Sequence, residues 1–177
     1  MKESNTTRPR IRYLPRHEQV GEMSVWKMLA IALIAFLTFT IVTSAIHELG
    51  IVISTALLGG TVIHTTISWF WGATNITGPL TGAALFFVLI SGTLFVMLFM
   101  FLLLFYPEPL YTNIVAVVLG FRNLIDGAPF LSGSDGFQAA KVSLIGAWVW
   151  YVVLFITFAY AVAYANGYKV EFRKGWN

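Results

Sequence analysis

The sequence contains no cysteine and few charged residues. Its 177 residues are 58% hydrophobic and only 11% charged. The absence of cysteine excludes disulfides, thiolate metal sites and cysteine nucleophiles. A soluble domain usually has about a quarter of its residues charged, and the mean hydropathy of this chain is +0.77. The composition therefore predicts an integral membrane protein that crosses the bilayer several times and contacts membrane lipids.

Several motifs of common function classes are also missing. The sequence has no glycine-rich phosphate loop, no recognisable Ser-His-Asp set and no pair of His residues at the spacing of a haem-binding bundle. The net charge of +3 does not indicate nucleic-acid binding, because the basic residues flank apolar segments. Lipid headgroups and membrane topology explain basic residues in such positions.

Four apolar segments predict an all-α polytopic membrane protein with about four transmembrane helices. We expect these helices at residues 25–58, 81–106, 110–125 and 137–165 of a single membrane domain spanning 25–166. The segment 110–125 is short for a full crossing, which takes about 20 residues. Residues 61–77 are rich in β-branched and aromatic side chains and contain turn residues, which predicts a short β-hairpin or re-entrant segment after the first helix.

The charge distribution predicts the orientation in the membrane. Residues 1–24 form a basic tail and residues 167–177 form a shorter one, and nine of the 11 Lys and Arg residues lie in or beside these tails. Four passes would place both tails on one side. Because cytoplasmic flanks carry an excess of Lys and Arg, we expect both termini in the cytoplasm and the protein in the cell membrane.

His47 and Glu48 form an adjacent ionisable pair in the first apolar segment. Glu48 is the only formally charged residue between positions 28 and 105. An ionisable residue at membrane depth is costly and indicates a functional site. The pair begins the pattern H-E-x-x-H, in which two His bind zinc and the Glu acts as general base. Ile51 occupies the position of the second His.

Four motifs in order resemble the site-2 proteases, which are intramembrane zinc metalloproteases. The motifs are Ala-Ile-His-Glu-Leu-Gly at 45–50, Leu-Leu-Gly-Gly-Thr-Val at 57–62, Thr-Gly-Pro-Leu-Thr-Gly at 77–82, and Asn-Leu-Ile at 123–125 followed by Ser-Asp-Gly at 134–136. They are similar to the active-site helix of that family, its exit into a hairpin, the start of its next helix and its Asn- and Asp-containing elements. The resemblance covers about residues 43–141.

The resemblance implies roles for three residues. His47 and Asp135 would be zinc ligands, and Glu48 would activate the zinc-bound water. Ile51 has no lone pair to donate, and Asp126 stands where the family usually has Pro. The sequence therefore predicts a non-catalytic member without cofactor, which serves as an accessory or partner-binding subunit. Its partners would be other membrane subunits or a transmembrane peptide.

Two other hypotheses remain open at this stage. The first is an active metalloprotease that binds zinc through His47, His64 and Asp135 and uses Glu48 as base, since a hairpin can fold back on the preceding helix. The second is a structural membrane subunit unrelated to proteases. In that case His64 is an interfacial residue, and Asp135 caps the last helix together with Ser134. Arg122 and Lys141 then only extend toward water, and 126–127 is a simple turn.

Overall fold

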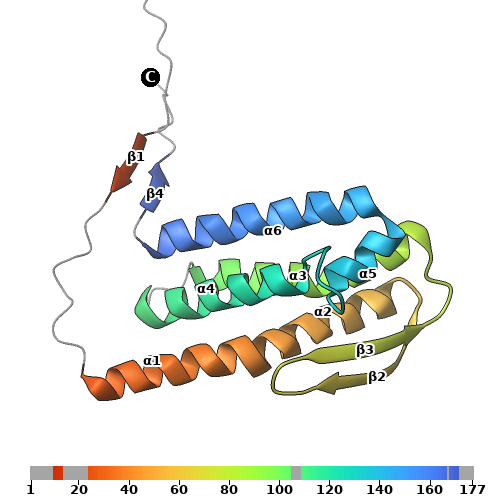
Figure 1. The fold of residues 1–177 in the computed structure, drawn as a ribbon, viewed down its shortest axis with the longest axis horizontal. Coiled ribbons are helices and arrows are strands. Elements are labelled where there is room, and N and C mark those ends of the chain that lie inside the picture. Colours follow the sequence, from red (N-terminus) through yellow and green to blue (C-terminus); the bar gives the residue numbers. More distant parts are fainter. Residues whose placement is uncertain (1–9, 14–23, 105–108, 167, 172–177) are drawn as a thin grey trace, which may run out of the picture.

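The computed structural model describes residues 10–13, 24–104, 109–166 and 168–171, and most of them are helical (Figure 1). The helical elements are α1 (Val25–Leu37), the π-helical turn η1 (Thr38–Val42), α2 (Thr43–Leu57), α3 (Gly82–Leu104), α4 (Pro109–Asp126), α5 (Asp135–Val142) and α6 (Leu144–Ala165). The strands are β1 (Arg10–Tyr13), β2 (Thr61–Ile67), β3 (Gly72–Thr77) and β4 (Tyr168–Glu171).

In the described part of the chain, three helical stretches are long and apolar enough to cross a membrane. They are Val25–Leu57, Gly82–Leu104 and Leu144–Ala165, with 33, 23 and 22 residues. The prediction of a membrane protein is supported by these stretches, because about 20 apolar residues cover the bilayer core. Helix α4 runs beside α3 and α6 (Figure 1) but is not among the three, so a fourth crossing stays a prediction.

The first stretch is a continuous helix with one wider turn. In η1 the backbone N–H of Thr43 donates to the carbonyl of Thr38, and the Thr43 hydroxyl donates to the same oxygen at 2.7 Å. Single π-helical turns are frequently found at functional sites. This one lies directly before α2, the helix that carries His47 and Glu48.

The predicted last helix, at 137–165, is wrong as a single element. Ser143 has an extended backbone, with φ −150° and ψ 101°, and separates α5 from α6. Its hydroxyl accepts a hydrogen bond from the Gly146 N–H, so it caps α6. Ser134 caps α5 by accepting from the Phe137 N–H. The prediction that Asp135 itself caps the last helix is therefore wrong, and Asp135 is the first residue of α5.

The predicted hairpin after the first helix is confirmed. Strands β2 and β3 pair antiparallel, with Thr65 opposite Thr74. The hairpin runs back along α2 (Figure 1). At its tip, the rings of Trp69 and Phe70 lie 6.5 and 6.3 Å from the ring of Phe36 in α1. The hairpin therefore lies alongside the first candidate membrane span rather than beyond its end.

A second strand pair was not predicted from the sequence. Strand β1 pairs antiparallel with β4, so that Arg12 stands opposite Lys169. The pair lies at the end of the helix bundle where α1 begins and α6 ends (Figure 1). The segments that precede the first helix and follow the last one therefore meet at the same end of the bundle.

Helices α2 and α3 pack closely against each other. A Cβ atom added at Gly50 would lie 2.7 Å from the carbonyl oxygen of Ser91 and 2.9 Å from the side chain of Phe95. The close approach lets the hydroxyls of Ser54 and Ser91 hydrogen-bond at 2.5 Å. Small residues commonly permit such contacts between helices in membranes. Helix α3 also packs on α4 and α6 through a buried apolar cluster of Val96, Met100, Leu104, Ala116, Leu119 and Ala161.

We expect Gly50→Val to separate α2 from α3, because the new side chain meets backbone atoms that cannot move aside. Such overpacking typically costs about 1–3 kcal/mol of unfolding free energy. The measurement is reversible unfolding of the purified chain in mixed micelles. The control is Leu49→Ala at the neighbouring position, which is 52% exposed. A Gly50→Val variant as stable as the control would contradict this packing.

Candidate functional site

His47 is held against α3 by a glycine. Its side chain is 6% exposed, and a Cβ atom added at Gly92 would lie only 2.5 Å from Nε2 of the imidazole. The missing side chain at position 92 therefore makes room for the ring between α2 and α3. The sequence motifs around His47 gave no indication of Gly92, because the two residues belong to different helices.

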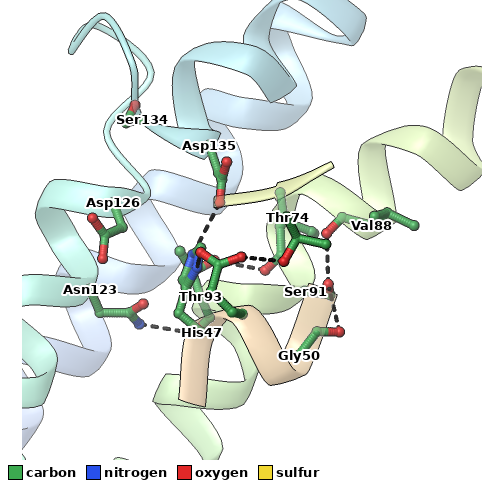
Figure 2. Close-up of polar contacts among 12 residues, drawn as sticks. His47, Gly50, Thr74, Val88, Ser91, Thr93, Asn123, Asp126, Ser134 and Asp135 are labelled. Atoms are coloured by element: carbon green, nitrogen blue, oxygen red, sulfur yellow. Dashed lines mark hydrogen bonds and ion pairs between the residues drawn. The ribbon is translucent and has the colours of Figure 1, made fainter. Parts of the chain in front are cut away.

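Asp135 meets His47 from α5. Its Oδ2 lies 3.2 Å from Nε2 of His47 (Figure 2). The loop before α5 is tied down by Ser134, whose hydroxyl lies 2.6 Å from the Ala128 carbonyl oxygen. Helix α5 can approach this loop because Gly136 has no side chain, and a Cβ atom there would lie 2.1 Å from the Gly127 carbonyl oxygen. Of the three proposed ligands His47, His64 and Asp135, the structure therefore brings His47 and Asp135 together.

Partial burial changes the acidity of Asp135, whose side chain is 27% exposed. Removal from water raises the pKa of this carboxyl group to about 6, while the charge of His47 opposes the rise. The negative charges of Glu48 and Asp126 contribute to the same upward shift. The carboxyl group of Asp135 therefore has a pKa of about 6. It lies 3.2 Å from Nε2 of His47, a nitrogen that can carry a proton.

Glu48 is fixed on the hairpin side of His47. Its Oε2 accepts a hydrogen bond of 2.5 Å from the Thr74 hydroxyl, and Oε1 lies 3.6 Å from Nδ1 of His47. A Cβ atom at Gly72 would lie 2.5 Å from Oε1. Thr74 and Gly72 therefore shape the position of this carboxylate. Neither was identified from the sequence, where the hairpin contributed only His64 as a candidate.

The three residues border one small cavity of about 80 Å³. Its walls come from α2, the hairpin, α4 and the loop before α5. They contain three carboxylates, one imidazole and one guanidinium, and the lining residues are Ser44, His47, Glu48, Trp71, Gly72, Arg122, Asp126, Gly133, Ser134 and Asp135.

Arg122 and Asp126 also line this cavity. The sequence had suggested only that Arg122 extends toward water and that residues 126–127 form a turn. Nε of Arg122 donates to Oδ2 of Asp126 at 3.0 Å, and the guanidinium lies 5.3 Å from the centre of the Phe39 ring. Both side chains are mostly buried, with 14% and 19% exposed. Opposite charges four residues apart on an otherwise apolar helix were the signal that could have identified them.

His64 and Ile51 lie elsewhere. His64 is exposed on β2, where its Nε2 lies 2.8 Å from the Thr66 hydroxyl, and it does not line the cavity. The structure therefore does not bring it to His47. Ile51 is 6% exposed and packs in an apolar cluster with Leu80 and Val88.

The donor atoms fit a metal ion only in part. Nε2 of His47 is buried and has no hydrogen-bond partner, although Oδ2 of Asp135 is 3.2 Å away. Two ligands of a tetrahedral zinc ion, each about 2.0–2.2 Å from it, stand about 3.4 Å apart. These two atoms therefore have the spacing of neighbouring ligands. However, no group of three or more His, Asp or Glu among the described residues is placed to hold a metal ion.

No protein-family model, curated protein or solved structure matches this chain. The resemblance to site-2 proteases therefore stays a prediction from the four sequence motifs.

We expect His47 and Asp135 to stabilise each other. In a double-mutant cycle with His47→Ala and Asp135→Ala, groups in contact usually show a coupling of about 0.5–3 kcal/mol. The measurement is the unfolding free energy of the two single variants and the double variant in mixed micelles. The control cycle combines His47→Ala with Asn166→Ala, since Asn166 hydrogen-bonds locally to Val162 at the end of α6. Additive effects in the first cycle would contradict the contact.

Proposed function

We propose that this chain is a non-catalytic integral membrane protein with a site-2-protease-like core that binds partner membrane proteins beside its hairpin. The observation that carries the proposal is the position of Ile51. A catalytic zinc site needs three protein ligands and an open position for water. His47 and Asp135 are paired, whereas Ile51 points into the apolar cluster with Leu80 and Val88.

The environment of Glu48 supports the absence of catalysis. A general base must reach the water that it deprotonates. The carboxylate of Glu48 is 4% exposed, accepts a hydrogen bond from Thr74 and lies against Gly72. These contacts bind the acid to the hairpin. In this proposal Glu48 couples α2 to the hairpin rather than activating water.

The hairpin supplies the proposed partner site. In the described part of the chain, β2 and β3 pair only with each other, so each has a free edge. Unpaired backbone groups at membrane depth cost several kcal/mol each unless protein covers them. The tip beside Phe36 also carries Trp69, Phe70 and Trp71, each more than half exposed. An extended segment of a transmembrane partner that adds to a strand edge would satisfy these groups.

The proposal includes four membrane crossings and cytoplasmic termini in the cell membrane. Helix α4 has 18 residues, which is about 27 Å at 1.5 Å per residue and close to the apolar thickness of a bilayer. The pairing of β1 with β4 is consistent with termini on one side. The concentration of Lys and Arg in the two tails supports the cytoplasmic side.

Partner binding is tested by photo-crosslinking from the hairpin in the native membrane. A photoreactive residue at Ile63, which is 68% exposed on β2, is expected to give discrete adducts with a membrane protein that also co-purifies in mild detergent. The control probe replaces Ile145, which is 80% exposed on α6. Equal crosslinking from both positions, or a chain that purifies alone, would contradict the proposal.

The second candidate function is a zinc-dependent protease that uses His47, Asp135 and a third ligand. The buried Nε2 of His47, which makes no hydrogen bond and lies 3.2 Å from Oδ2 of Asp135, is the observation that favours it. Metal analysis of the purified chain separates the two functions. We expect less than stoichiometric zinc in the wild type and no difference in His47→Ala. One zinc per chain that disappears in His47→Ala would favour the protease and overturn the non-catalytic proposal.

A further inference from the structure

The cavity beside His47 carries an excess of negative charge. Its lining contains three carboxylates and one permanent cation, and these residues are Glu48, Asp126, Asp135 and Arg122. Arg122 is already paired, because its Nε donates to Oδ2 of Asp126 at 3.0 Å. Carboxylates taken out of water are costly unless cations or hydrogen-bond donors compensate them. The lining therefore favours a cation that comes from outside the site.

Asp135 is the acid that lacks a donor. In the part of the chain that the structure describes, its carboxylate accepts no hydrogen bond, and its one ion pair is with His47. Glu48 differs in this respect, since its carboxylate accepts a hydrogen bond from the Thr74 hydroxyl. The Asp135 side chain is 27% exposed, and an ionised carboxylate has about four lone-pair sites. It can therefore accept hydrogen bonds from a ligand.

His47 presents a second acceptor at the same place. Its side chain lines the cavity and is only 6% exposed, and its Nε2 is buried without a hydrogen-bond partner. Nδ1 lies 3.6 Å from Oε1 of Glu48, which favours the proton of a neutral imidazole on Nδ1 and leaves the lone pair on Nε2. Nε2 and Oδ2 of Asp135 face each other at 3.2 Å (Figure 2). A donor group that bonds to both acceptors would satisfy them together.

Trp71 and the size of the cavity suit an alkylammonium group. Trp71 lines the cavity from the tip of the hairpin and is 55% exposed, so the cavity reaches the surface there. Cations bind on the face of tryptophan rings, and aromatic sites of this kind recognise ammonium groups. The cavity of about 80 Å³ has room for one ammonium group and the carbon next to it, since a single water needs about 10–15 Å³. Lysine carries its charge on such a compact group, whereas the guanidinium of arginine is a planar fork.

We infer that the cavity binds the ammonium group of a lysine from the partner membrane protein, through Asp135, Nε2 of His47 and the ring of Trp71. The inference rests on the proposed function and gives the partner its chemistry. Trp71 and Gly72 belong to the hairpin and also line the cavity, so a segment bound beside the hairpin passes the cavity. A lysine in a transmembrane segment is costly unless it pairs with an acid, and Asp135 supplies that acid.

The charge preference of the cavity is tested first, without a partner. The chain has no cysteine, so Ser44→Cys places a single thiol in the cavity lining. The purified full-length chain in non-ionic detergent is treated at low salt with the cationic reagent aminoethyl methanethiosulfonate or the anionic reagent sulfonatoethyl methanethiosulfonate. After correction for the rates with a free thiol, we expect the cationic reagent to react roughly 10-fold faster or more, because a cleft lined by one sign of charge concentrates counter-ions.

Adding Asp135→Asn to Ser44→Cys should reduce this ratio of rates several-fold. The matched control is Glu171→Gln, which removes the same charge from β4 at the opposite end of α6 (Figure 1) and should leave the ratio unchanged. A thiol introduced by Thr77→Cys, which is exposed at the end of β3 and outside the cavity lining, should show no preference for the cation.

A more exposed position guards against a thiol that no reagent reaches. If Ser44→Cys reacts with neither reagent, the same measurement is made with Trp71→Cys. Absence of a charge preference at both positions would overturn the inference. A preference that Asp135→Asn leaves unchanged would also overturn it, because the charge of Asp135 is the one that the ligand is inferred to use.

The lysine itself is identified in the photo-adduct formed from Ile63 in the native membrane. Asp135→Asn should lower the yield of that adduct several-fold, whereas Glu171→Gln should not. Lysines of the crosslinked protein are then replaced one at a time by Met. One replacement is expected to lower the yield as Asp135→Asn does, and the two changes together should lower it no further, because groups in contact do not act additively.

The two proposals fail in different ways. An adduct whose yield depends on an arginine, or on no basic residue, would overturn the lysine inference and leave partner binding in place. A chain that gives no adduct and purifies alone would overturn partner binding, and the lysine inference with it, even where the thiol reagents show that the cavity prefers a cation.

Discussion

The contact between His47 and Asp135 is the constraint around which the rest of the molecule is arranged. It joins α2 to α5 in the interior of a chain with little charge. An imidazole and a carboxylate can be buried there only if neighbouring groups leave room for them and compensate their polarity. Gly92 leaves the space for the ring, and Ser134 fixes the start of α5. The contact is therefore positioned in part by residues that carry no charge, Gly92 and Ser134.

The same constraint extends to the hairpin and to α4. Glu48 follows His47 directly, so its carboxylate must also be accommodated, and Thr74 of β3 donates a hydrogen bond to it. On the other side, Arg122 and Asp126 neutralise each other at the cavity wall. The hairpin is thus held to α2 by a polar contact, whereas the Arg122–Asp126 pair lies within α4 and borders the same cavity. A partner that displaces the hairpin would act directly on Glu48.

The proposed loss of catalysis has its physical origin at position 51. One aliphatic side chain at position 51 removes a donor and adds to the apolar cluster with Leu80 and Val88. His47 and Asp135 keep their spacing because the packing of α2, α3 and α5 fixes them. A scaffold of this kind can retain a peptide-binding surface after it has lost catalytic activity, since the addition of a strand uses only backbone groups.

The sequence by itself determined the membrane class, the long first helix and the hairpin at 61–77, because apolar length and β-branched clusters are local properties of the chain. That His47 meets Asp135 was only an expectation from the resemblance, and the tertiary structure decided it. The sequence did not reveal the break at Ser143, the β1–β4 pair, or the parts played by Gly72, Thr74, Gly92 and Arg122. Those depend on which helix faces which, and therefore on distances between residues far apart in the chain. Only the tertiary structure decided that His64 lies away from His47 and that Asp126 borders the same cavity.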